Sequence, residues 1–166
     1  MRRINTVLSA ILLVIADQLI KLLVIARLKP IGSLGVINGF LRLNYVENTG
    51  AAFGSFSSHT AILSIITFLA VTVGFYYLLS GKIKFGFEYV CILLVLSGGI
   101  GNLIDRVFRG FVIDYIEPTF IDFAVFNFAD ILVTCGAVLL IIWLIKDIVK
   151  DFRKPKENKS DERTDN

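Results

Sequence analysis

Long apolar segments alternate with short polar connections along this chain. Residues 60–81, TAILSIITFLAVTVGFYYLLSG, contain no charged side chain. A run of about 18 or more such residues is typical of a transmembrane helix rather than of a buried helix in a soluble core. Three weaker apolar segments accompany it. The pattern therefore predicts transmembrane helices at about residues 4–26, 59–80, 87–107 and 130–149.

The connections between these segments carry patterns of their own. In GVINGFLRLNYVEN, apolar and polar residues alternate through residues 36–47. Such alternation predicts a short strand or hairpin, and its apolar face suits a position near the lipid headgroups. The expected fold is an all-α membrane bundle of four helices with a small β element.

The composition supports a membrane protein. Of the 166 residues, 55% are hydrophobic and 19% charged, and the mean hydropathy is +0.75. A soluble domain would have about a quarter charged residues and no long apolar runs. The start, MRRINTVLSAILLVIADQL, also resembles a signal peptide. We interpret it as a retained helix, because apolar residues resume after Lys21. We expect one integral membrane domain at 1–149 and a disordered cytoplasmic tail at 150–166.

Basic residues are distributed unevenly between the ends of the predicted helices. The N-terminus, the 81–86 connection and the tail are basic, and the tail from Lys146 onward holds seven Lys or Arg. The other two connections share five. Because cytoplasmic loops are rich in Lys and Arg, we predict that both termini and the 81–86 connection are cytoplasmic. Residues 27–58 and 106–130 then face outward.

Cysteine and histidine chemistry has little support in the sequence. The predicted topology puts Cys91 near the cytoplasmic end of the third helix and Cys135 near the outer end of the fourth. A separation on the order of 20 Å follows from about 1.5 Å per residue, which is beyond disulfide reach. The single histidine, His59, fits a flanking position. We expect no metal site.

Polar residues gather at the outer ends of three predicted helices. An ionisable group at membrane depth costs roughly 2.5–3.5 kcal/mol and usually marks function. Because these polar residues lie at the same end of the predicted bundle, they indicate one site near the outer membrane surface. The residues concerned are Asp17, Gln18 and Lys21 in the first helix, Asn102, Asp105 and Arg106 in the third, and Asn127 and Asp130 in the fourth.

Each of these features also has a purely structural interpretation. Asp17 and Lys21 are spaced as an i, i+4 ion pair, which either holds helices together or acts at the site. Ser97 and Gly101 form a small-xxx-small face for helix packing. Asp130 could be the N-cap of its helix. Asp105 and Arg106 could be boundary charges.

Two carboxylates are candidates for acid–base catalysis. Asp114 has apolar neighbours in VIDYI, although it could be an ordinary loop residue, and Asp130 follows Asn127 in FNFAD. If the two meet, one keeps a proton and the other does not. The pair then offers a general base and a general acid, enough to direct water at a peptide carbonyl. Our hypothesis puts the charge on Asp130 first and the proton on Asp114.

The sequence resembles the lipoprotein signal peptidase (signal peptidase II) family of bacterial membrane-embedded aspartic peptidases. The resemblance spans Asp17 to Asp130, with every block in the family's order. The blocks are DQLIK (17–21), NTGAAFG (48–54), GGIGNLIDR (98–106), VIDYI (112–116) and FNFAD (126–130).

This resemblance implies specific roles. Asp114 and Asp130 would be the catalytic dyad, and the site would be lined by Asn48, Asn102, Arg106 and Asn127. Support would come from Asp17, Lys21, Asp105 and Gly50. The implied substrate is a diacylglyceryl-modified prolipoprotein, cleaved just before the lipidated Cys. We expect a monomeric, multi-pass protein of the bacterial plasma membrane that contacts lipid but no nucleic acid. Its site would be extracytoplasmic, its β element likewise, and it would need no cofactor.

Two other functions remain open on the residues alone. A proton- or ion-coupled transporter also uses intramembrane Asp and Lys, but its acids should extend into the cytoplasmic half, where the sequence offers little beyond Glu88. A non-enzymatic assembly or chaperone protein would use the outer polar cluster as an interaction surface.

Overall fold

The computed structural model describes residues 2–50 and 60–153. Several sequence predictions concern residues outside this part: residues 51–54 of the NTGAAFG block, His59, and the tail from 154 onward. Within the described residues the elements follow the order α1 (Arg2–Leu23), a π-helical turn η1 (Val24–Leu28), β1 (Ser33–Ile37), β2 (Leu41–Asn48), α2 (Thr60–Ser80), α3 (Phe87–Arg109), β3 (Val112–Pro118) and α4 (Phe128–Arg153).

In the described part of the chain, four helices are long and apolar enough to cross a membrane. Their outer faces expose large apolar side chains, such as Leu12 on α1 and Phe68 on α2. Charged side chains such as Asp17 and Lys21 lie fully buried instead. Apolar residues outside and polar residues inside suit a bundle surrounded by lipid. The four predicted helices are therefore present, as is a small antiparallel sheet.

Helix α3 is the central helix and contacts α1, α2 and α4. Glycines allow this close packing. A Cβ on Gly98 would overlap the carbonyl oxygen of Ala129, and one on Gly101 would lie 2.5 Å from Asp17 Oδ2. The predicted small-xxx-small face included Gly101, which packs against Asp17 and Ala129, and Gly98 beside it brings the backbone of α3 close to that of α4, as small residues do in membrane helix pairs.

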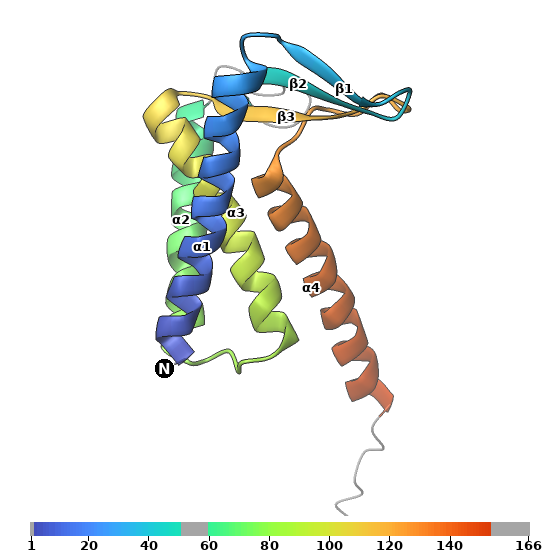
Figure 1. The fold of residues 1–166 in the computed structure, drawn as a ribbon. Helices are drawn as coiled ribbons and strands as arrows, with labels where there is room; N and C mark the ends of the chain where they lie inside the picture. Colours follow the sequence, from blue (N-terminus) through green and yellow to red (C-terminus); the bar gives the residue numbers. More distant parts are fainter. Residues whose placement is uncertain (1, 51–59, 154–166) are drawn as a thin grey trace, which may run out of the picture.

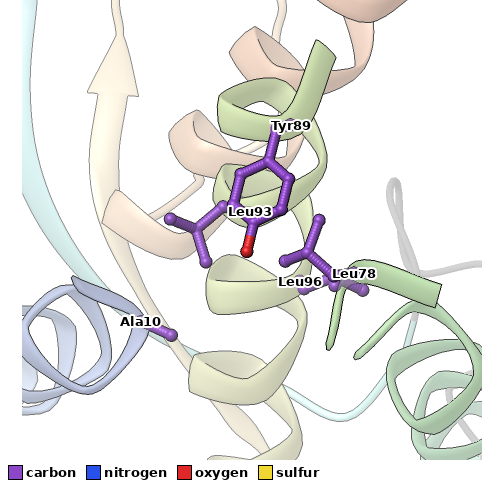
Figure 2. Packing of buried hydrophobic residues seen from close by; sticks show 5 residues of the cluster. All are labelled: Ala10, Leu78, Tyr89, Leu93 and Leu96. Atoms are coloured by element: carbon purple, nitrogen blue, oxygen red, sulfur yellow. The ribbon is translucent and has the colours of Figure 1, made fainter. Parts of the chain in front are cut away.

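An apolar cluster holds the bundle at the end away from the sheet. Figure 2 shows Ala10 of α1 and Leu78 of α2 gathered around α3, which contributes Tyr89, Leu93 and Leu96. The Tyr89 hydroxyl is hydrogen-bonded to the buried hydroxyl of Thr6. This end of the bundle is therefore fixed by packing, and the polar network described below lies elsewhere.

The sheet forms the opposite end of the molecule (Figure 1). Its strand order is β1-β2-β3, and both pairings are antiparallel. The alternation at 36–47 had predicted the hairpin, whereas β3 had been expected only as a loop. Strand β3 packs on the end of the first helix, because Ile113 and Tyr115 are buried against Val24 and Leu28 of the π-helical turn.

The N-terminal end of α1 and the C-terminal end of α4 lie at the same end of the molecule, away from the sheet (Figure 1). Helix α4 begins at Phe128 and continues to Arg153, past the predicted limits of 130 and 149. Helix α3 likewise ends at Arg109 rather than 107, where Gly110 takes a left-handed conformation with φ of 81°. Glycine adopts this conformation without steric cost, so the chain turns directly into β3.

Candidate functional site

The N-terminus of α4 is built as a capping box. Asn127 precedes the helix, and its Oδ1 accepts the N–H of Asp130 at 3.0 Å. In return, Asp130 Oδ2 accepts the backbone N–H of Asn127 at 3.0 Å. This reciprocal pattern places Asn127 at the N-cap and Asp130 three residues later. The prediction that Asp130 could be the N-cap is therefore wrong, since Asn127 takes that position.

Asp114 lies on β3 and is 2% exposed. Its Oδ2 accepts the Asn48 side-chain amide at 2.8 Å, and its Oδ1 accepts the Asn127 amide at 2.6 Å. Asn48 is itself held by the N–H of Gly50, which bonds Asn48 Oδ1 at 2.9 Å. Burial raises the pKa of Asp114 from 3.8 to about 6, opposed by the Asn48 and Asn127 hydrogen bonds and assisted by the nearby charge of Asp130. The fold therefore favours the neutral form of Asp114 more than water does.

Asparagine amides join the two carboxylates. Asn127 bonds both, through its side chain to Asp114 and through its backbone to Asp130. Asn102 of α3 donates its amide to Asp130 Oδ1 at 2.7 Å, and its own oxygen accepts the Asn127 amide at 3.1 Å. Every oxygen of the two carboxylates therefore has an N–H donor, which fixes the orientation of both groups.

A buried ion network lies beneath these asparagines. Lys21 of α1 is fully buried, and its Nζ lies 2.9 Å from Asp17 Oδ2 and 2.8 Å from Asp105 Oδ2. The same Nζ donates to Asn102 Oδ1 at 3.0 Å. The predicted Asp17–Lys21 pair is therefore present, and it extends to α3 and to an asparagine that holds Asp130. Buried charges persist only when paired in this way.

Arg109 also joins this network, although it was not among the predicted site residues, and it bonds Gln18, which was. Arg109 bonds Asp105 Oδ1 at 2.5 Å and Gln18 Oε1 at 3.1 Å, and Gln18 in turn donates to the Gly101 carbonyl at 3.1 Å. Arg109 is one of the five basic residues of the two connections predicted to face outward. Its spacing of four residues from Asp105 was the available signal, since i, i+4 pairs face each other on a helix.

A cavity of about 430 Å³ opens beside the carboxylates. Arg106 lies in its wall and, among residues 2–50 and 60–153, forms no ion pair. Most of the remaining wall is apolar. The lining residues are Asn48, Gly50, Arg106, Val112, Asp114, Phe123, Ala124, Val125, Phe126, Asp130, Ile131, Thr134 and Cys135.

The described residues include no group of three His, Cys, Asp or Glu side chains that could hold a metal ion. Cys91 and Cys135 are both free thiols. The polar groups that line the cavity are two carboxylates, one arginine and the Asn48 amide, with the Thr134 hydroxyl and the Cys135 thiol on α4. A pair of carboxylates in different environments can act as acid and base towards a bound water.

The sequence is similar to those of known proteins. A family model described as signal peptidase (SPase) II matches residues 9–146. The lipoprotein signal peptidase of Clostridioides difficile (strain 630) is 42% identical over 139 residues, which is 84% of this chain and 93% of that protein. The lipoprotein signal peptidase of Lactobacillus johnsonii is 39% identical over 142 residues, or 86% of this chain and 92% of the relative.

The fold is similar to a solved structure as well. A bacterial membrane enzyme superimposes with a TM-score of 0.80 and 37% sequence identity, over 93% of this chain and 94% of the other. A second bacterial membrane enzyme gives a TM-score of 0.72 at 38% identity. With the family match and the relatives of similar length, these likenesses show that the chain belongs to the signal peptidase II family.

Proposed function

We propose that this protein is a membrane-embedded aspartic endopeptidase that removes the signal peptide from diacylglyceryl-modified prolipoproteins. Membership of the signal peptidase II family supports protease activity and lipoprotein processing in a bacterial membrane. The observation that carries the mechanism is the pair Asp114 and Asp130, which share Asn127 as a donor and line one cavity.

The two carboxylates have different roles at the start of the reaction. Asp130 holds the negative charge and takes a proton from the attacking water, and Asp114 donates its proton to the carbonyl oxygen of the scissile bond. The raised pKa of Asp114 supports this assignment, because a neutral acid is needed there. The water oxygen bonds to the carbonyl carbon and gives a tetrahedral diol.

Breakdown of the diol completes the reaction. The proton gained by Asp130 passes to the nitrogen of the departing Cys, and Asp114 recovers its proton from a hydroxyl of the diol. The C–N bond breaks, leaving a carboxylic acid on the signal peptide and a free amine on the lipidated Cys. One water is consumed, and both carboxyl groups return to their initial states. Asn48, Asn102 and Asn127 hold the two carboxyl groups in place throughout.

The lining of the cavity supports a lipid-linked, apolar substrate. Phe123, Val125 and Phe126 line one part of it, and Ile131 lines another on α4. Arg106 brings a positive charge among these residues and is available to bind a carbonyl oxygen of the substrate backbone. Helix α4, which is long and apolar enough to cross a membrane, begins at Phe128 beside this cavity, so an acyl chain could remain in lipid while the peptide enters.

The test is cleavage of a synthetic lipobox peptide by the purified full-length protein in detergent micelles. One peptide carries S-diacylglyceryl-Cys, and a matched peptide carries unmodified Cys. We expect cleavage of the lipidated peptide alone, and mass spectrometry should find the new amine on the lipidated Cys. Equal cleavage of both peptides, or a cut elsewhere, would contradict the proposed substrate class.

A further inference from the structure

The residues just before the two candidate catalytic aspartates are held in the same way. Asp105 Oδ2 accepts the backbone N–H of Ile113 at 3.2 Å, next to Asp114. Asp17 Oδ1 accepts the backbone N–H of Ala129 at 3.1 Å, next to Asp130. Each of these buried carboxylates therefore fixes the backbone at one member of the pair. The two contacts come from different helices, α3 and α1.

Lys21 connects the two contacts. Its Nζ bonds Asp17 Oδ2 at 2.9 Å and Asp105 Oδ2 at 2.8 Å, so one buried cation joins the carboxylate beneath Asp130 to the one beneath Asp114. We call Asp17, Lys21 and Asp105 the lysine bridge. A third bond, from Lys21 to Asn102 Oδ1 at 3.0 Å, turns the Asn102 amide so that its NH₂ faces Asp130.

We propose that Lys21 is a positioning residue that sets the separation between Asp114 and Asp130. This inference rests on the proposed function and deepens it, because it assigns the ion pair of the first helix a part in the reaction. Lys21 is fully buried and does not line the cavity, so it acts through the lysine bridge and through Asn102 without touching substrate. Geometry of this kind matters, since a misplacement of about 1 Å can cost about a hundredfold in rate.

From the charges around Lys21 we expect that a neutral residue does not replace it. Asp17 lies on its own helix, Asp105 and Arg109 on α3, and Asp114 on β3 is close enough to feel its charge. On α4, Asp130 is linked through Asn102. Without Lys21, Asp17 and Asp105 would be like charges in a buried site, so they would repel each other or take up a proton. Either change loosens the backbone at Ile113 and Ala129.

The experiment compares Lys21→Met with wild type and with Tyr89→Phe, a control that removes a buried hydroxyl at the far end of the bundle. Thermal unfolding in detergent gives the folded fraction of each, and kcat, KM and the pH profile of kcat/KM are measured with the lipidated peptide. We expect Lys21→Met to lower kcat on the order of a hundredfold. KM should stay within about twofold of wild type, because no group that contacts substrate is lost.

The pH profile separates positioning from simple loss of stability. The acidic and alkaline limbs of the profile report the two apparent pKa values of the carboxylate pair. These two values are far apart when the carboxylates are close, because each opposes ionisation of the other. If the aspartates separate in Lys21→Met, the limbs should move closer together. Tyr89→Phe should keep wild-type limbs and a wild-type kcat per folded molecule. Lys21→Met behaving like Tyr89→Phe would overturn the proposal.

A second variant covers the case in which Lys21→Met does not fold. Asp17→Asn keeps an oxygen for the Ala129 N–H but removes the negative charge that pairs with Lys21. We expect a smaller loss of kcat and limbs shifted in the same direction, and unchanged limbs in this variant would also overturn the proposal. Wild-type cleavage of the lipidated peptide serves as the reference. If wild type itself failed to cleave, the proposed function would fail rather than the role of Lys21.

Discussion

At the scale of single residues, the site depends on amides that hold carboxylates in fixed orientations. Asn127 is the clearest case, because it caps α4, bonds Asp114 and bonds Asp130 with its backbone N–H. Its neighbours on α3 and β2, Asn102 and Asn48, complete the donors to the two carboxylates. The FNFAD block therefore supplies both the N-terminal cap of α4 and part of the candidate site, because Asn127 belongs to both.

The raised pKa of Asp114 gives a prediction for stability. Its pKa is about 6 in the folded protein against an ordinary value of 3.8. The neutral form is favoured by the fold, so the contribution of Asp114 is fully present below about pH 4 and is lost as the pH rises through about 6. Relative to Asp114→Asn, the wild type should lose on the order of 1–3 kcal/mol of unfolding free energy across this range.

Thermal or denaturant unfolding of both proteins in detergent between pH 4 and pH 7 would measure this effect. A constant difference in stability over the whole range would show that Asp114 titrates with its ordinary pKa. The comparison does not depend on activity, so it can be made even where the variant is inactive.

The site residues predicted from the sequence lie together in the structure, but most contacts between them were not predicted. These residues were named from five blocks of the sequence that match one family. The structure adds two contacts between separate elements that no block indicated: Asp17 bonds the N–H of Ala129, and the Tyr115 hydroxyl accepts the N–H of Phe128. Such contacts depend on how each helix is rotated and how deeply it sits, which hydrophobic periodicity does not specify.

At the scale of elements, α4 is held by its first turn and by glycine packing. The N–H groups of Phe128, Ala129 and Asp130 all have side-chain acceptors, which a helix beginning in a buried place requires. Gly98 of α3 lets the backbone of α4 approach at Ala129, directly beside Asp130. The π-helical turn and strand β3 were not predicted, because both depend on packing between distant segments.

Gly98→Ala should therefore disturb both stability and activity. The added Cβ would overlap the Ala129 carbonyl and lie 2.8 Å from Val133 Cγ2, so α4 must move away from α3. Overpacking of this kind costs about 1–3 kcal/mol. We expect a lower unfolding temperature together with a fall in kcat, measured on the same preparation.

Gly99→Ala is the matched control. Its Cβ would face α2 and approach the Val71 side chain at 3.1 Å, where a small shift relieves the contact. It should therefore change stability less and leave kcat near the wild-type value. Equal effects of the two variants would contradict the claim that the α3–α4 approach positions Asp130.

At the scale of the whole molecule, the fold separates two ends. One end holds the sheet, the two carboxylates and the ion network. The other end holds the apolar cluster of Figure 2, the N-terminal end of α1 and the C-terminal end of α4. This polarity disfavours a transport path, which needs polar groups at successive depths. Together with the basic residues of the 81–86 connection, it supports an orientation with the termini in the cytoplasm and the sheet outside.

Cysteine labelling of intact cells would test this orientation. Val36→Cys on β1 and Lys84→Cys in the α2–α3 connection both introduce exposed thiols. A membrane-impermeant maleimide should label Val36→Cys in intact cells and should reach Lys84→Cys only after the membrane is opened. The unsubstituted protein gives the background from Cys91 and Cys135. The reverse labelling order would invert the proposed topology.

The most direct test of the central claim is the activity of Asp114→Asn and Asp130→Asn on the lipidated peptide, with and without a metal chelator. Asn at position 130 keeps an oxygen for the capping box, removes the acid–base group and loses the acceptor of the Asn102 amide, so a capping role and a catalytic role give different results. We predict folded variants that are both inactive, and wild-type activity that survives chelation. Wild-type activity in either folded variant would contradict a dyad mechanism.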